Sequence, residues 1–149
     1  MKAHATTKGQ GLALAREVRL LPAVVTEKIN VFGQSGGGKT TVAMLLAELM
    51  LKMAAQIVVA DLAGVWWGLR SSADGKKKAY DILIAGGEHG DLPVNISRVK
   101  GGRPGGKDLL KTSGAAIAEV VVGKGISIIL DLSDLKDDEQ CAFLLDFFA

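Results

Sequence analysis

The stretch from Gly33 to Thr40 constrains the fold of this chain more than any other part of its sequence. It reads Gly-Gln-Ser-Gly-Gly-Gly-Lys-Thr and fits the spacing G-x-x-x-x-G-K-S/T. Its glycines let backbone N–H groups approach an anion, because no Cβ lies in the way. An apolar run at 28–32 precedes the stretch and an amphipathic run at 39–53 follows it. A strand, a glycine-rich loop and a helix in this order predict a phosphate-binding loop.

Each residue type of this loop meets a requirement of nucleoside triphosphate binding. The first N–H groups of the following helix, at the positive end of its dipole, attract the same anion. We expect Lys39 to reach the β and γ phosphates of ATP, Thr40 to bind Mg²⁺ and Thr41 to contact the α phosphate. A flexible glycine-serine linker is the alternative, which the flanking strand and helix disfavour. The expected nucleotide contacts are Gly33, Ser35, Gly36, Gly37, Gly38, Lys39, Thr40 and Thr41, and Lys39 is the expected catalytic residue.

Composition places the chain among ordered α/β domains. The sequence has 149 residues, 48% of them hydrophobic, which is enough to build a covered core. Its formal net charge of +2 permits a nucleic-acid partner without requiring one. The single Cys141 lies in an apolar stretch, which predicts a buried side chain in a reducing compartment. The sequence lacks a signal-like N-terminus and any uncharged run long enough to span a bilayer, so we expect a cytoplasmic protein without membrane contact.

Strand-like and helix-like runs alternate after the loop, which predicts an α/β fold with a mostly parallel sheet flanked by helices. Residues 1–22 are expected to form an approach segment and residues 23–149 a P-loop nucleotide-binding domain. A helix cap is expected at Ser133 or Asp134. The other expected elements are a helix at 39–53, strands at 56–61, 81–85 and 125–132, and helices at 108–122 and 135–149.

Aspartates end two of the predicted strands. Ligands of parallel sheets bind beyond the carboxyl ends of the strands, so we expect Asp61 and Asp131 to lie along one edge with the phosphate loop. Asp131 ends an apolar strand, as the Mg²⁺-ordering aspartate of a Walker B strand does, and it is a candidate metal ligand. Leu132 rather than glutamate follows it, which favours a supporting or strand-capping role instead. For Asp61, a metal-bound water and a capped turn both stay open.

Several other polar and aromatic residues allow two interpretations. Trp66 and Trp67 either stack on bases or pack in an apolar stretch, and their position after a strand favours packing. His89 has acidic neighbours but fits no metal-ligand spacing, which favours a turn near the nucleotide. The basic runs at 76–78 and 100–107 are either DNA-backbone contacts or solvated loops.

Four stretches carry a more specific pattern. Residues 21–28 precede the loop, and residues 61–70 read Asp-Leu-Ala-Gly-Val-Trp-Trp-Gly-Leu-Arg. Residues 86–93 read Gly-Gly-Glu-His-Gly-Asp-Leu-Pro, and residues 128–133 read Ile-Ile-Leu-Asp-Leu-Ser. From about Leu20 to its end, the chain resembles the HerA/FtsK-type ATPases, in particular the HerA-like ATP-binding proteins among the DNA-translocating motors.

The chain also departs from that group. Leu62 stands where the group has proline, Val65 replaces an acidic residue, and residues 100–107 resemble a local insertion. In the group, the Walker B strand with its Asp-Glu pair follows the D-L-S strand and the next helix, which is beyond Ala149 here. The last predicted helix also ends on apolar residues 147–149 without a C-cap. We therefore expect an N-terminal part of a longer protein, without the carboxylate that activates water.

The resemblance implies a RecA-like P-loop NTPase fold and a function. It implies the ATP-binding core of an ATP-dependent DNA translocase or helicase, which uses ATP and Mg²⁺ and works as a homo-oligomeric ring, expected to be a hexamer, often beside a nuclease. A neighbouring subunit would supply an arginine finger, for which Arg70 is only a guess. Two alternatives stay open: a module that binds ATP without hydrolysing it, and a small P-loop kinase.

Overall fold

The computed structural model describes residues 12–13, 16, 19–21, 23, 26–72, 77–101 and 109–149. These residues fall into two compact units, one up to Ala55 and the other from Gln56 onward. In the described ranges, no helix has both the length and the apolar character needed to cross a membrane. The predicted division into residues 1–22 and 23–149 stays a prediction.

The first unit contains the phosphate loop and the helix that follows it. Two short strands, β1 (Leu12–Ala13) and β2 (Arg19–Leu20), pair antiparallel. Helix α1 (Lys39–Lys52) confirms the helix predicted at 39–53, and Leu46, Ala47 and Leu49 form its buried face. Its last turn carries Lys52, whose positive charge suits the negative end of the helix dipole.

The strand predicted at 28–32 is wrong for this structure. These residues adopt no regular secondary structure, and Phe32 is 89% exposed. A strand needs a neighbouring strand to satisfy its N–H and C=O groups, and an apolar run does not supply one. The apolar pattern was therefore insufficient evidence for a strand at this place.

The second unit is built on a parallel sheet, as predicted. Strands β3 (Val58–Asp61) and β4 (Ile82–Ala85) flank the central β7 (Ser127–Asp131) in the order β3-β7-β4. All five residues of β7 are buried. The three strands predicted at 56–61, 81–85 and 125–132 are confirmed, and their continuous apolar runs are typical of strands covered on both faces.

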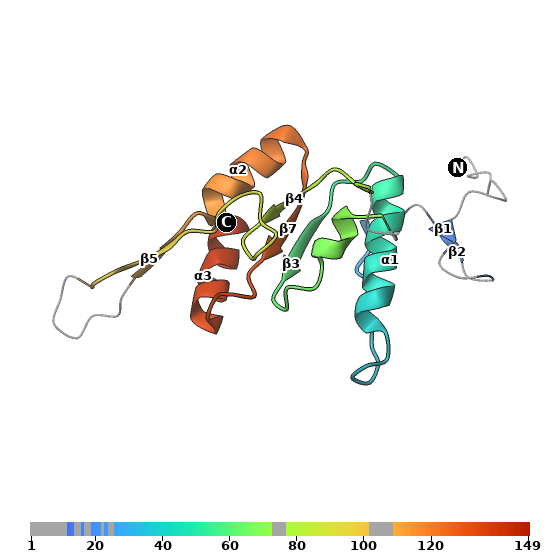
Figure 1. Ribbon diagram of the computed structural model, residues 1–149, viewed down its shortest axis with the longest axis horizontal. Coiled ribbons are helices and arrows are strands. Elements are labelled where there is room, and N and C mark those ends of the chain that lie inside the picture. Colours follow the sequence, from blue (N-terminus) through green and yellow to red (C-terminus); the bar gives the residue numbers. More distant parts are fainter. Residues whose placement is uncertain are drawn as a thin grey trace, which may run out of the picture. The chain divides into compact units, whose positions relative to one another are not determined.

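Helices α2 (Gly114–Lys124) and α3 (Asp137–Phe147) lie on the same side of this sheet (Figure 1). Alternate residues of β7, Ile128 and Leu130, pack in one core with residues of these helices, including Val121 and Phe143. Because side chains alternate along a strand, Asp131 points to the other face of the sheet, together with Ile129. The residues of this core are Ala85, Ile117, Val121, Ile128, Leu130, Leu132, Phe143 and Phe147.

The helix predicted at 108–122 begins later than expected, because the segment before it is a strand. β6 (Leu109–Thr112) pairs antiparallel with β5 (Ile96–Val99), and this hairpin extends away from α2 and α3 (Figure 1). The Thr112 hydroxyl donates to the Asp146 carboxylate and accepts the Gly114 N–H, so α2 begins at Gly114. Most of the predicted insertion, residues 102–107, lies outside the described residues.

The start and the exposed side of α3 also differ from expectation. The Lys136 N–H donates to the Glu139 carboxylate and fixes the start of the helix, so the predicted cap at Ser133 or Asp134 is wrong. Cys141 is exposed rather than buried. The reason is helix phase, because Phe143 and Phe147 take the core positions of α3.

Candidate functional site

The phosphate loop has the backbone conformation that its glycines allow. Gly36 and Gly38 adopt positive φ angles of 76° and 77°, which side chains with a Cβ rarely adopt. A Cβ at Gly37 would lie 3.0 Å from the carbonyl oxygen of Gln34. No side chain caps the N-terminus of α1, so its first N–H groups face the loop without a side-chain competitor. These features fit a polyphosphate, which needs donors and close backbone approach.

The Lys39 ammonium binds backbone carbonyls of the phosphate loop. Its Nζ donates to the carbonyl oxygens of Gly33 at 2.9 Å and Gln34 at 2.7 Å. Hydrogen bonds to a charged phosphate are stronger than those to neutral carbonyls, so a phosphate can take over these donors. Thr40 and Thr41 are exposed in the first turn of α1, where their hydroxyls can reach a ligand. The assignment of individual contacts to ATP and Mg²⁺ stays a prediction.

Asp61 caps the turn that follows β3. Its Oδ1 accepts the N–H groups of Ala63 at 3.1 Å and Gly64 at 2.9 Å, and its Oδ2 accepts the Trp66 N–H at 2.8 Å. The residue is 2% exposed. Of the two interpretations of Asp61, the geometry favours the capped turn, because both carboxylate oxygens already have donors.

Asp131 lies beside Asp61 in the sheet register, as the shared edge predicted. It is 5% exposed, and its Oδ1 accepts both the N–H of Ser133 at 3.1 Å and its hydroxyl at 2.6 Å. The loop after β4 lies directly against this residue. A Cβ at Gly87 would collide with the Asp131 carboxylate, and one at Gly86 with its backbone carbonyl. The metal role of Asp131 stays a prediction.

Arg70 is held by its own chain. It ends the short helix η2 (Trp67–Arg70), and its Nη1 donates to both carboxylate oxygens of Asp91, at 2.7 and 2.6 Å. The Asp91 Oδ2 also accepts the Ile84 N–H at 2.9 Å. This pair fastens the Trp-Trp-Gly-Leu-Arg segment to β4. An arginine finger must reach a neighbouring active site, so the guess of Arg70 for that role loses support.

Trp67 and His89 pack on each other. Their ring centroids are 4.2 Å apart, with 33° between the ring planes. Trp67 remains 42% exposed, so this contact covers only part of its ring. Within the described ranges, His, Cys, Asp and Glu form no group of three or more that could hold a metal. His89 lies in a turn, as its spacing indicated, and the nearness of this turn to the nucleotide stays a prediction.

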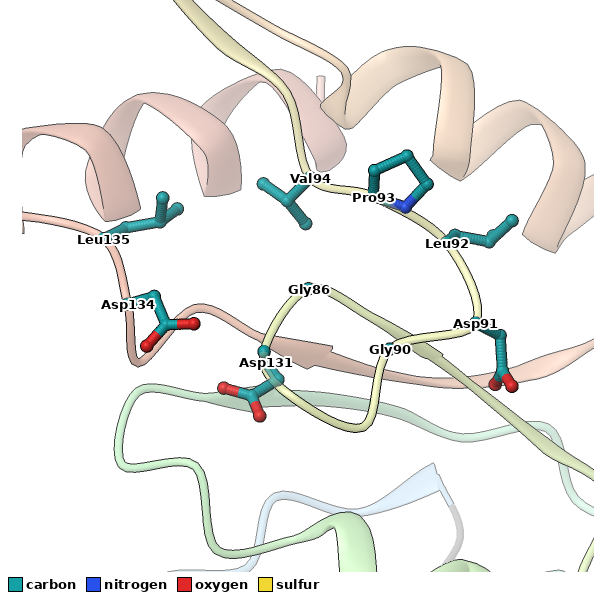
Figure 2. Close-up of a pocket in the computed structure, with 10 residues that line it drawn as sticks. Gly86, Gly90, Asp91, Leu92, Pro93, Val94, Asp131, Asp134 and Leu135 are labelled. Carbon is teal, nitrogen blue, oxygen red and sulfur yellow. The ribbon is translucent and has the colours of Figure 1, made fainter.

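A cavity of about 430 Å³ lies at the carboxyl ends of β4 and β7 (Figure 2). It belongs entirely to the second unit. One wall is apolar, Asp134 lies at one end, and the Asp131 carboxylate points away from the apolar wall. Its lining residues are Gly86, Gly87, Gly90, Asp91, Leu92, Pro93, Val94, Asp131, Asp134 and Leu135.

Comparison with known proteins identifies the family. Residues 15–144 match the family described as "Helicase HerA, central domain". The chain belongs to the HerA central-domain family. Neither the curated proteins nor the solved structures gave a match. The family confirms the resemblance, the P-loop NTPase fold and the ATP-binding type of the domain. HerA proteins generally use ATP and Mg²⁺, and they typically form oligomers and bind DNA.

Three of the four HerA-like stretches, residues 61–70, 86–93 and 128–133, meet in the second unit, and sequence reasoning foresaw only the shared edge of Asp61 and Asp131. The loop of residues 86–91 contacts Asp131 through its glycines and Arg70 through Asp91. On the other side, a Cβ at Gly64 would lie 2.7 Å from the Ser133 hydroxyl. The sequence did contain a signal for these contacts, the glycine pair Gly86-Gly87 and the aspartate Asp91. Their partners, Asp131 and Arg70, are distant in the sequence, so the pairing could not be read from it.

Proposed function

We propose that this HerA domain is the ATP-binding core of an ATP-dependent DNA translocase or helicase. The observation that carries the proposal is the phosphate loop, whose left-handed glycines, uncapped helix start and inward Lys39 ammonium suit a polyphosphate. The family match to helicase HerA supports the choice of DNA as the partner. Hydrolysis of ATP would supply the free energy for movement along DNA.

The loop residues have distinct roles in this proposal. The glycine amides and Lys39 hold the phosphates, and Thr41 contacts the α phosphate. Thr40 binds Mg²⁺ through its hydroxyl, with Asp131 as a candidate for a further metal contact. We further propose a cytoplasmic ring of identical subunits, a hexamer, in which a neighbouring subunit supplies the arginine finger and a nuclease is an associated partner.

Phosphate release in the presence and absence of DNA tests this function. We expect DNA to stimulate ATP hydrolysis by the wild-type protein and Lys39→Ala to abolish it, because the phosphates lose their ammonium partner. Lys52→Ala, at the other end of α1, is the matched control and should retain wild-type turnover. Wild-type turnover in a folded Lys39→Ala variant would reject the assignment.

A second candidate is a module that binds ATP without hydrolysing it. The observation that favours it is the state of the strand-end carboxylates: Asp61 uses both oxygens in its turn, and Asp131 is followed by Leu132 rather than glutamate. Such a module would bind ATP, and Lys39→Ala would abolish that binding. It would release no phosphate, whether or not DNA is present. The same assay therefore separates the two candidates.

A further inference from the structure

We infer that Trp67, held against His89, is a stacking site for an unpaired base of a single-stranded nucleic acid. The inference goes beyond the proposed function, which names DNA as a partner but no residue that contacts it. All residues of this site belong to the second unit and none to the phosphate loop. The site would therefore bind single strands whether or not the domain hydrolyses ATP.

The aromatic surface of the site is a ring pair that the fold covers only in part. The 4.2 Å between the ring centroids and the 33° between the planes place the His89 imidazole over one face of the Trp67 indole. Trp67 is nevertheless exposed, and so are Leu62 and Val65 of the same segment. A nucleobase is a flat ring that can cover such an indole, and every base offers this surface.

The ring pair is fixed in place by hydrogen bonds on both of its segments. On one side of Trp67, the Asp61 carboxylate accepts the N–H of Trp66 at 2.8 Å. On the other side, Arg70 ends the same short helix, and its Nη2 donates to the carbonyl oxygen of His89 at 3.4 Å. One guanidinium therefore joins the segment of the indole to the turn of the imidazole. A ring that is already ordered loses little conformational freedom when a ligand binds.

A basic turn beside this helix favours a nucleic acid over a protein partner. The bridge between Ser71 and Lys78 places the turn directly after η2. Lys77 is exposed and forms no ion pair with a described residue, whereas Asp81 and Asp91 each have a cationic partner. Proteins that bind single strands combine cations for the phosphates with aromatic rings for the bases. The cores of protein–protein interfaces are instead depleted in lysine.

Fluorescence of the Trp66→Phe variant tests the inference, because Trp67 is then the only tryptophan of the chain. The phenylalanine keeps the backbone N–H that Asp61 accepts. We expect a twelve-nucleotide oligothymidine to quench the fluorescence saturably at low salt and without ATP, since a stacked base quenches an indole. An abasic strand of the same length carries the phosphates without the bases, so it should bind more weakly and leave the fluorescence unchanged.

Variants measured by anisotropy of a labelled oligothymidine give the contribution of each group. Trp67→Ala should weaken binding about tenfold, the typical cost of losing one stacked base. Phe148→Ala removes another exposed aromatic side chain of the second unit, so it is the matched control and should bind like the wild type. Lys77→Ala should reduce the slope of log affinity against log salt by about 0.7, as expected for one phosphate contact on a single strand. Glu88→Gln removes an exposed carboxylate beside His89 and should strengthen binding about twofold.

The controls decide between a single strand, a free nucleotide, a protein partner and no site. The inference is overturned if oligothymidine gives no saturable quenching, if the abasic strand quenches as strongly, or if Trp67→Ala and Phe148→Ala bind equally well. AMP that quenches the indole and displaces the oligothymidine would overturn it in favour of a nucleotide site. A change of oligomeric state in Trp67→Ala, without oligothymidine binding by the wild type, would overturn it in favour of a protein interface. The quenching comparison still applies if Trp67→Ala does not fold, and it is independent of ATP hydrolysis.

Discussion

The phosphate loop and the carboxyl edge of the sheet are built by different means. The loop is an exposed stretch of consecutive residues, and its conformation depends on glycines and the start of one helix. The edge joins segments that lie as much as 70 residues apart in the sequence, from Asp61 to Asp131, through a shared register and close glycine contacts. The loop is therefore organised for a ligand, whereas the edge is organised first for the fold.

Gly87→Ala should have the largest effect on stability. The new Cβ would meet the Asp131 carboxylate at a position where φ is +63°, so both overpacking and backbone strain oppose folding. We expect a loss of about 3 kcal/mol in the free energy of unfolding, measured by urea denaturation. Gly123→Ala is the control, since a Cβ there contacts nothing within 4 Å and Ala favours the helix. Equal stability of both variants would contradict the claim that close glycine contacts hold the sheet edge together.

Gly38→Ala should reduce ATP affinity more than it reduces the stability of the fold. A Cβ at Gly38 has no neighbour within 4 Å, but its φ of +77° is unfavourable for alanine by about 1–2 kcal/mol. We expect ATP affinity to fall about tenfold, because relaxing this strain moves the first amides of α1. Fluorescence titration with a labelled ATP analogue measures the affinity, and urea denaturation measures the stability. Unchanged affinity with a large loss of stability would contradict the comparison.

Asp91→Asn should have a moderate effect confined to the second unit. The variant loses the charge that pairs with Arg70, in a contact whose side chains are 29% and 38% exposed. Because solvent screens such a pair, we expect a loss of about 1 kcal/mol in unfolding free energy. ATP affinity should remain at the wild-type value. A matched fall in ATP affinity would show that the edge contributes to nucleotide binding directly.

The smallest effect should be the pH dependence at Asp146. The Thr112 hydroxyl and the Ala115 N–H lower the pKa of this carboxyl, so its folded pKa lies below the unfolded value. Its stabilisation is therefore present above the unfolded pKa of about 3.9 and is lost as the pH falls through the folded pKa. The stability difference between wild type and Asp146→Asn, from urea midpoints, should shrink from pH 7 toward pH 3. A difference that grows in acid would contradict this sign.

The sequence predicted local features better than contacts between distant segments. The phosphate loop, α1 and the three parallel strands follow from spacing and from continuous apolar runs, which are local properties. The run at 28–32 failed because a strand also needs a partner. The segment at 109–112 failed because pairing with β5 outweighed its helical pattern. Cys141 was misjudged because the positions of the phenylalanines set the buried side of α3.

The cavity beside Asp131 could not be predicted for the same reason. Its glycines and aspartates were visible as motifs, but only the sheet register and the approach of Gly87 bring them together. A one-dimensional pattern records which residues are present but not which distant residues the strand register places side by side. The phosphate loop needs no such information, because the nucleotide contacts predicted for it, Gly33 to Thr41, lie in one continuous stretch.

Isothermal titration calorimetry of the folded chain with ATP and Mg²⁺ tests the central claim most directly. The account predicts a saturable heat with one site per chain, which disappears in a folded Lys39→Ala variant. A folded wild-type chain that takes up no ATP, or an Lys39→Ala variant that binds it as tightly, would contradict the account.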